Sequence, residues 1–152
     1  MLKPDNSMKL IIESRSKNEG FVRQAVAAFA AQLDPTISEI NDIKTAVSEA
    51  VTNAIIHGYP DSFGYITITV QLIQDSVRIS VKDQGCGISD IAKAMEPAFT
   101  TGDSERSGMG FTIMKSFMDK LSIRSKVGKG TTVTMCKNLS PRYPRLAAYH
   151  NE

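Results

Sequence analysis

The alternation of apolar and polar residues between positions 66 and 81 constrains the fold more than any other feature of this chain. Apolar side chains occupy every second position in residues 66–72 and again in residues 77–81, on either side of a turn at 74–76. Successive side chains of a strand point to opposite faces of a sheet. The pattern therefore predicts an antiparallel hairpin with one buried face and one polar face.

Apolar residues recur at helical spacing in three other stretches. Pro35 is expected to end the first helix, because the residue before a proline avoids the helical region. Thr36 and Glu39 form a capping-box signature for the second helix. That helix is expected to run to His57 and to stop at Gly58. The three helical stretches are residues 21–33, 40–54 and 110–121.

Short apolar runs predict three further strands, at Lys9–Ser14, Leu121–Lys126 and Thr131–Lys137. The resulting order is βααββ, a long loop, then αββ. Helices segregated from mostly antiparallel strands indicate an α+β fold, a two-layer α/β sandwich with a mixed, mostly antiparallel sheet and helices on one face. A chain of 152 residues suits a single domain. We expect its core at about residues 9–139 and a flexible tail at residues 140–152.

Composition excludes several classes of protein. Eighteen lysines and arginines against sixteen acidic residues give a net charge of +2, which is not the strongly basic balance of a nucleic-acid binder. No apolar run has the length of a signal peptide core or of a transmembrane helix. Cys86 and Cys136 form no metal-ligand or redox spacing. We expect a cytoplasmic protein without direct contact to nucleic acid or membrane.

Glu49, Asn53 and His57 are spaced by four on the second predicted helix and share one side of it. A carboxylate, an amide and an imidazole in line indicate a cation or phosphate site. Taken alone, the same pattern also describes an ordinary solvated helix face.

Asp83-x-Gly85-x-Gly87 follows directly after the second strand of the hairpin. A carboxylate at the rim of a sheet can accept a hydrogen bond from an exocyclic amine such as that of adenine. The glycines allow positive φ and a close approach of the backbone to a flat ligand. The alternative is a plain turn at a strand end, where Asp and Gly are common.

Two further motifs complete the set. Gly108-Met109-Gly110 opens the third helix. A glycine-rich helix N-terminus offers free N–H groups to phosphate. The alternative is a plain helix start after a loop. The spacing of this motif is neither the Walker nor the Rossmann pattern. Gly130-Thr131 begins the last strand, where a threonine hydroxyl can bond a ligand or simply suit a strand.

The four elements occur in the order E-x-x-x-N, D-x-G-x-G, G-x-G and G-T, and this order resembles the ATP-binding fold shared by gyrase, the chaperone Hsp90, histidine kinases and MutL. Residues 32–36, 43–59 and 106–114 are also similar to the sporulation anti-sigma F factors. The resemblance covers roughly residues 9–139. Proteins of that family are ATP-dependent serine kinases that also hold a sigma factor inactive.

The resemblance implies a role for each matching residue. Asn53 would bind Mg²⁺ that bridges the phosphates of ATP, and Glu49 would be the general base for the substrate serine. Asp83 would bind the adenine amine, Gly87 would let the ring approach, and Thr131 would support this contact through water. The other expected nucleotide-binding residues are Gly85, Thr100, Thr101, Ser104, Arg106, Ser107, Gly108, Met109, Gly110 and Phe111.

The chain departs from the family pattern after Thr101, where close relatives have a lysine and this sequence has Gly102. A phosphate contact from a lysine is therefore not expected there. Cys86, between the two glycines, is interpreted as a small tolerated side chain rather than a redox group. Arg23, expected on the exposed side of the first helix, matches the arginine with which the family binds its partners, although exposed arginines are usually only solvated.

The resemblance also implies three partners. They are sporulation sigma factor F, an anti-anti-sigma factor that is phosphorylated on serine, and a second copy of the chain, for which the N-terminal strand is a candidate contact. Two other functions remain open from the sequence. One is a stress-response anti-sigma kinase with the same catalytic residues and other partners. The other is an ATP-sensing module that binds proteins but transfers nothing.

Overall fold

The hairpin predicted from the alternating residues forms the centre of the sheet as strands β2 (Tyr65–Ile73) and β3 (Ser76–Asp83). The two strands pair antiparallel, with Ile68 opposite Val81. The apolar residues of both strands are buried on the same face, while their polar neighbours remain partly exposed. The period-two pattern therefore identified both the strands and their buried side.

The computed structural model describes residues 2–96 and 110–140. The other strands of this part are β1 (Asn6–Glu13), β4 (Lys120–Lys126) and β5 (Gly130–Asn138). Its helices are α1 (Lys17–Ala30), α2 (Ile37–Asn53), α3 (Ile91–Ala94) and α4 (Gly110–Phe117), with a 3-10 turn at Ala31–Leu33 and a π-helical turn at Ala54–Gly58.

The strands are ordered β1-β2-β3-β5-β4, and every pairing among these described strands is antiparallel. The sequence had predicted a mixed sheet, which is wrong in this respect. The reason is the connection after β3, which leads to β4 at the edge of the sheet. A short turn then brings β5 back between β4 and β3, antiparallel to both.

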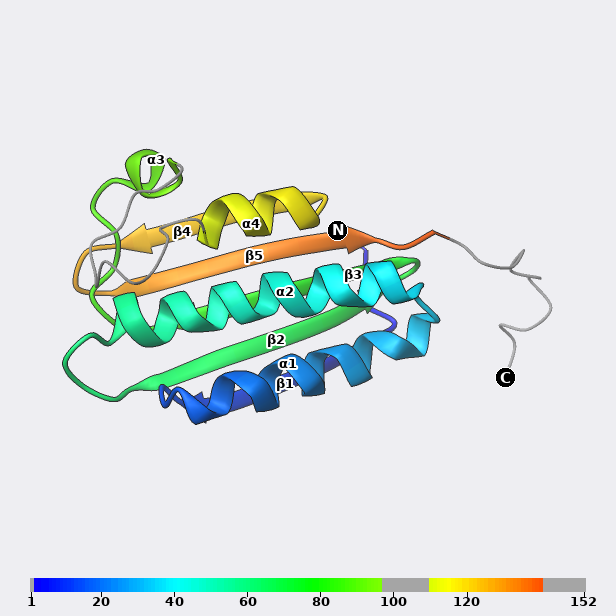
Figure 1. Ribbon diagram of the computed structural model, residues 1–152, viewed down its shortest axis with the longest axis horizontal. Helices are drawn as coiled ribbons and strands as arrows, with labels where there is room; N and C mark the ends of the chain where they lie inside the picture. The colour runs from blue at the N-terminus through cyan, green and yellow to red at the C-terminus, as the bar shows by residue number, and fades with distance from the viewer. Residues whose placement is uncertain (1, 97–109, 141–152) are drawn as a thin grey trace.

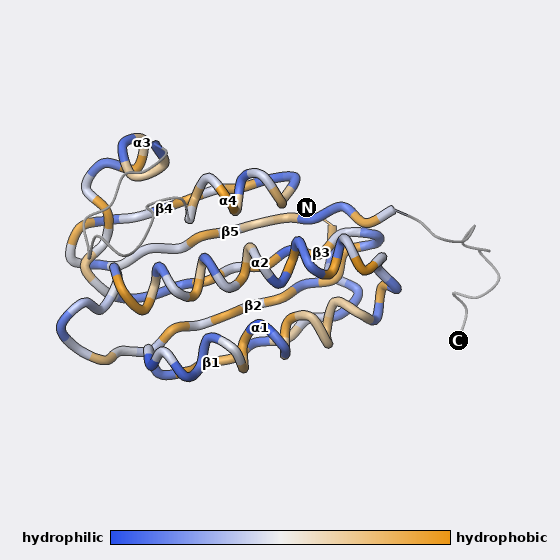
Figure 2. Tube along the Cα trace, in the orientation of Figure 1, coloured by the Kyte–Doolittle hydropathy of each residue, from blue (hydrophilic) through white to orange (hydrophobic). Residues whose placement is uncertain are grey.

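Helices α1, α2 and α4 cover one face of the sheet, which confirms the predicted two-layer α+β sandwich (Figure 1). The core lies between the two layers, and Figure 2 shows its hydrophobic residues along the strands and recurring along each covering helix. Fully buried examples are Val22, Val47, Ile68, Ile79, Met114 and Met135. Within the described ranges, no helix combines the length and the apolarity needed to cross a membrane.

The ends of α2 are set by different chemistry. At its start, Thr36 Oγ1 accepts the N–H of Glu39 at 3.1 Å, and Glu39 Oε1 accepts the N–H of Thr36 at 2.8 Å, so the predicted capping box is confirmed. At its end, α-helical geometry stops at Asn53 and the chain makes a π-helical turn to Gly58. The sequence predicted a regular helix to His57. Such turns often mark functional sites.

Candidate functional site

A cavity of about 380 Å³ opens where α2 and β3 end and α4 begins, at the left of the view in Figure 1. This volume falls in the range of small-molecule sites, which span roughly 300–1,000 Å³. Much of the wall is apolar, so a flat ring system fits between the helix layer and the sheet. The apolar lining residues are Ala50, Ala54, Val81, Ile88, Ala94, Phe111 and Val133.

Asp83 is the main buried polar group of the cavity. It is the last residue of β3 and only 5% exposed. Burial raises the pKa of its carboxyl above the ordinary value, while hydrogen bonds from the N–H groups of Gly85 and Thr131 act in the opposite direction. The Gly85 N–H reaches Asp83 Oδ1 at 2.9 Å. A carboxylate held in this way keeps lone pairs for a donor in the cavity.

The glycines around Asp83 serve close packing within the protein. A Cβ atom on Gly58 would lie 2.9 Å from Cγ of Asp83, and one on Gly85 would overlap the carbonyl of Gly58. The same carbonyl accepts the N–H of Cys86 at 2.9 Å. The π-helical turn is thus clamped onto the loop after β3.

This arrangement changes the interpretation of Gly58 and Gly85 and supports that of Gly87. Gly58 was predicted as a helix stop, but it does not take the left-handed conformation, and its small size matters because of the neighbouring carboxylate. Gly85 does not line the cavity. Gly87 does line the cavity. Its φ of +77° is a left-handed conformation that glycine adopts readily, as predicted for this motif.

Glu49 and Asn53 meet at the N-terminus of α4. A Cβ atom on Gly110 would lie 2.9 Å from Asn53 Nδ2 and 3.3 Å from Glu49 Oε2. A larger residue at this position would force the Asn53 side chain to shift. Asn53 lines the cavity, and Glu49, one helical turn earlier and half-buried, does not. The carboxylate and the amide both lie beside the start of α4, and the amide also lies on the cavity wall.

Thr131 and Phe111 also line the cavity, from the start of β5 and the first turn of α4. Together with Asn53, Asp83, Gly87 and Gly110, they are the predicted nucleotide-binding residues that the structure brings to one place. Gly85, which is also in this set, is described but does not line the cavity. The remaining predicted residues of the set lie outside the described part of the chain. They are Thr100, Thr101, Ser104, Arg106, Ser107, Gly108 and Met109.

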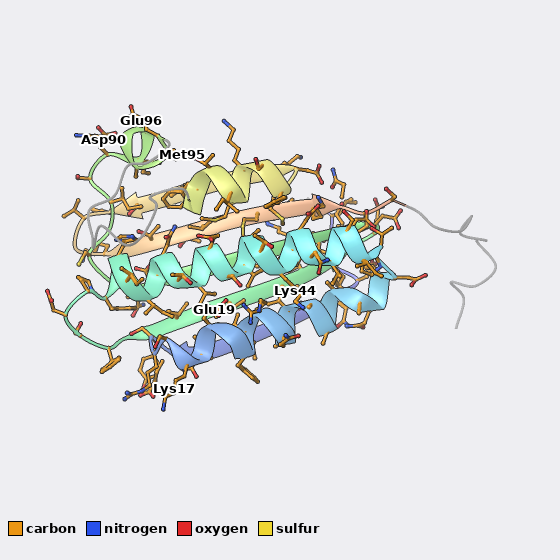
Figure 3. The ribbon with its side chains drawn as sticks, viewed as in Figure 1. Lys17, Glu19, Lys44, Asp90, Met95 and Glu96 are labelled. Atoms are coloured by element: carbon orange, nitrogen blue, oxygen red, sulfur yellow. The ribbon has the colours of Figure 1, made fainter. Side chains whose placement is uncertain are left out.

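The sequence interpretation missed one whole wall of the cavity. Ile88, Ser89, Asp90, Lys93 and Ala94 supply it, directly after the predicted Gly87. Asp90 caps α3 by accepting the Lys93 N–H at 3.1 Å. Figure 3 shows Asp90, Met95 and Glu96 on this segment, at the end of the molecule where α4 begins. A four-residue helix gives no periodic signal, and the only available sign was an aspartate three residues before Lys93.

Tyr59 is a second residue that the sequence did not identify. Its hydroxyl accepts the N–H of Gln84 at 2.7 Å and donates to the carbonyl of Tyr65 at 2.8 Å. The side chain therefore ties the end of β3 to the start of β2, next to Asp83. His57, which the sequence pattern grouped with Glu49 and Asn53 in a possible cation or phosphate site but not among the nucleotide-binding residues, lines the cavity.

Arg23 lies away from the cavity, at the seam between α1 and α2. Its Nη1 donates to Glu19 Oε1 at 3.1 Å and to Ser48 Oγ at 3.4 Å. Its side chain is 38% exposed. Its expected position on the exposed side suggested a freely solvated side chain, but the two contacts hold it in place at the surface. In Figure 3, Glu19 lies on the side of α1 that is turned toward α2, whereas Lys17 projects away.

Comparison with known proteins places this site in a family. Residues 12–137 match the histidine kinase-like ATPase domain. The chain is 59% identical over 133 residues to an anti-sigma F factor of Thermoanaerobacter sp. (strain X514), covering 87% of this chain and 93% of that protein. It is 58% identical over 134 residues to the anti-sigma F factor of Caldanaerobacter subterraneus subsp. tengcongensis, with coverages of 88% and 94%.

Among solved structures, the fold resembles the RsbU and RsbW domains of a Mycobacterium tuberculosis protein, with a TM-score of 0.66 and 26% identity. The match covers 91% of this chain and 33% of that one, so this chain corresponds to about a third of the solved protein. The predicted resemblance is confirmed on both counts. This chain belongs to the histidine kinase-like ATPase family and, within it, to the anti-sigma F factors.

Proposed function

We propose that this protein holds a sporulation sigma factor of the F type inactive, and that it uses ATP to phosphorylate a serine of an anti-anti-sigma factor. The observation that carries the proposal is that Glu49 and Asn53 both lie beside Gly110, next to a cavity that Asn53, Gly110 and the buried Asp83 line. Its relatives at 58–59% identity are named anti-sigma F factors, which supports the regulatory half.

The cavity suits the adenine end of ATP. Asp83 presents a buried carboxylate to the exocyclic amine, and apolar residues such as Val81 and Val133 flank the space for the ring. The phosphates would then extend toward Asn53 and the N-terminus of α4, where the positive end of the helix dipole favours anions. Gly110 keeps this N-terminus unobstructed.

The described side chains could hold a magnesium ion only together with the phosphates of ATP. Within residues 2–96 and 110–140 there is no group of three or more His, Cys, Asp or Glu side chains that would hold a metal ion. Magnesium prefers oxygen ligands and usually keeps several waters. Asn53 would supply its amide oxygen, and the bound ion would neutralise charge on the phosphates.

Glu49 would act as the general base. It would accept the proton of the substrate hydroxyl as the serine oxygen bonds to the terminal phosphorus and the bond to ADP breaks. Its position one turn from Asn53 brings the base beside the phosphate end of the site. Positioning of this kind accounts for most of the catalysis in phosphoryl transfer.

The partner contacts and the setting complete the proposal. Arg23 would bind the protein partners from the α1–α2 seam, and the two partners would compete for overlapping surface. The protein would act in the cytoplasm as a homodimer. Support for the dimer comes from β1, which lies at an edge of the sheet and can pair with a second copy.

The first experiment measures transfer of radiolabelled phosphate from ATP and Mg²⁺ to a purified anti-anti-sigma factor. Wild type is compared with Glu49→Gln, which keeps the shape of the side chain without its basicity. We expect the variant to bind ATP normally and to lose at least about a hundredfold in transfer rate. Thr45→Ala, on an exposed position of α2, is the control and should transfer at the wild-type rate.

The outcomes separate the remaining functions. Binding of ATP by wild type without transfer to any anti-anti-sigma factor would overturn the kinase assignment and favour a binding module. Transfer only to a stress-response substrate would overturn the assignment to sporulation. Equal transfer by wild type and Glu49→Gln would remove Glu49 from the role of base.

A further inference from the structure

Ser125 occupies an unusual position beside the cavity. It lies on β4 opposite Thr131 of β5, on the side of the strand that faces the helices, and it is half-buried. Its Oγ takes part in three hydrogen bonds, with the N–H of Ile88 at 2.7 Å, the carbonyl of Gly130 at 3.1 Å and Thr131 Oγ1 at 2.8 Å. Ile88 and Thr131 both line the cavity, which Ser125 itself does not.

The number of protons in this group fixes the direction of each bond. A hydroxyl has one proton to donate and two lone pairs to accept. The carbonyl of Gly130 can only accept, so Ser125 donates its proton there. The Ile88 N–H can only donate, so Ser125 accepts from it. The remaining contact is satisfied only if Thr131 donates its hydroxyl proton to Ser125.

The partners of Ser125 are themselves held firmly. A Cβ atom on Gly130 would overlap the carbonyl oxygen of Asp83, so the start of β5 sits directly on the end of β3. The backbone N–H of Thr131 donates to the Asp83 carboxylate. The orientation of the Gly130 carbonyl, on which the proton order depends, is therefore set by the same packing that places Asp83.

We infer that Ser125 is a positioning residue that makes Thr131 a pure hydrogen-bond acceptor toward the cavity and thereby sharpens the choice of adenine over 6-oxopurine nucleotides. With its proton committed to Ser125, Thr131 Oγ1 offers only lone pairs, as the Asp83 carboxylate does. A 6-amino group, directly or through one water, supplies the donors that this pair needs. A 6-oxo group brings another acceptor and leaves the buried acceptors unpaired. The inference rests on the proposed function, because it assumes that the cavity binds the base of ATP.

Equilibrium binding tests the inference without any transfer reaction. The dissociation constants of ATP and inosine triphosphate, which differ at the 6-position, are measured for wild type and Ser125→Ala by displacement of a fluorescent ADP analogue. We expect wild type to prefer ATP strongly and Ser125→Ala to lower the ratio of the two constants by about three- to tenfold. A merely structural defect would weaken both nucleotides equally and leave the ratio unchanged.

Further variants make the test specific. Ser125→Thr keeps the hydroxyl and should restore the wild-type ratio. In a Thr131→Val background, Ser125→Ala should no longer change the ratio, because its effect acts through the missing hydroxyl. Ser122→Ala removes an exposed hydroxyl from the same strand and is the matched control.

The results distinguish this inference from the proposed function. An unchanged ratio in Ser125→Ala, or a full effect of Ser125→Ala in the Thr131→Val background, would overturn the role of Ser125 while ATP binding stands. Failure of wild type to bind ATP at all would instead overturn the proposed function.

Discussion

Asp83 combines a binding role with a cost to stability. Its carboxyl is buried where it lines the cavity, and burial raises its pKa above the ordinary value. A group whose pKa is higher in the folded than in the unfolded state gives the folded protein more bound protons between the two values. The unfolding free energy therefore falls as pH rises through this window, and at neutral pH the ionised carboxylate lowers stability.

Substitution Asp83→Asn should separate these two effects. We expect at least a tenfold loss of ATP affinity, because the amide replaces one acceptor by a donor. The nucleotide-free protein should be as stable as wild type or more stable at neutral pH, since the buried charge is gone. Any gain in unfolding free energy should shrink as pH falls toward the Asp83 pKa.

Calorimetry of ATP binding and urea unfolding at several pH values check both parts. Asp61→Asn, which removes an exposed carboxylate from the loop before β2, should change neither quantity appreciably. Unchanged ATP affinity in Asp83→Asn would remove Asp83 from the base contact. A large loss of stability at neutral pH would show that its hydrogen bonds outweigh its burial.

At the scale of the element, the loop after β3 depends on its contact with the π-helical turn. Gly85→Ala would push the new methyl group into the carbonyl of Gly58, so the loop must move and carry Asp83 with it. We expect a loss of about 1–3 kcal/mol in the free energy of unfolding, as for other overpacked sites. ATP affinity should fall at least tenfold, as measured by the same calorimetry.

Gly128→Ala provides a sharp control for this prediction. Gly128 has φ of +78° but nothing within 4 Å of an added Cβ atom. Alanine there meets only backbone strain, roughly 1–2 kcal/mol, without displacing a neighbour. The variant should keep wild-type ATP affinity. If both alanine variants lost affinity equally, general destabilisation would explain the result for Gly85.

The capping box of α2 gives a prediction about stability alone. Thr36→Ala removes the hydroxyl that accepts the N–H of Glu39, and we expect a loss of about 1 kcal/mol in the free energy of unfolding. ATP affinity should not change, because Asn53 lies at the other end of a 17-residue helix. The control is Ser38→Ala, which removes an exposed hydroxyl two residues further along the chain. The measurement is the midpoint of urea unfolding.

The pH dependence of this variant has a defined sign. Burial acts to raise the pKa of Glu39, but hydrogen bonds from Thr36 and Ser140 and the charge of Lys137 bring it below the ordinary value. Glu39 therefore stabilises the fold above its unfolded pKa, and this contribution is lost as pH falls through the lowered value. The deficit of Thr36→Ala should shrink in the same acidic range. A deficit that grows on acidification would contradict the role of Glu39.

Over the whole molecule, local sequence patterns predicted the features that depend on residues close together in the chain. The β2–β3 hairpin, the capping box and the position of Asp83 at a strand end all follow from side-chain spacing, and the structure confirms them. The packing of Gly58 on Gly85, the tie made by Tyr59 and the proton order at Ser125 join residues far apart in the chain. No local pattern encodes such contacts, and the short helix α3 carries too few residues for a periodic signal.

The position of Arg23 leads to the prediction that concerns the whole assembly. Its guanidinium is held by Glu19 and Ser48 at the α1–α2 seam, and Arg23 is not among the cavity-lining residues. Exposed ion pairs of this kind contribute little to stability, about 0–1 kcal/mol. Arg23→Ala should therefore keep the fold and ATP affinity but weaken sigma-factor binding at least tenfold, because a charged contact at a partner interface is lost.

Binding of purified sigma factor F in the presence of nucleotide, followed by surface plasmon resonance, is the measurement. Lys17→Ala removes a positive charge from the same helix at a site that projects away from α2, and it should bind as wild type does. Because the two substitutions change net charge equally, a difference between them cannot come from long-range attraction alone. Equal affinity of Arg23→Ala and wild type would place the partner surface elsewhere on the molecule, and equal weakening by both variants would reduce the role of Arg23 to its charge.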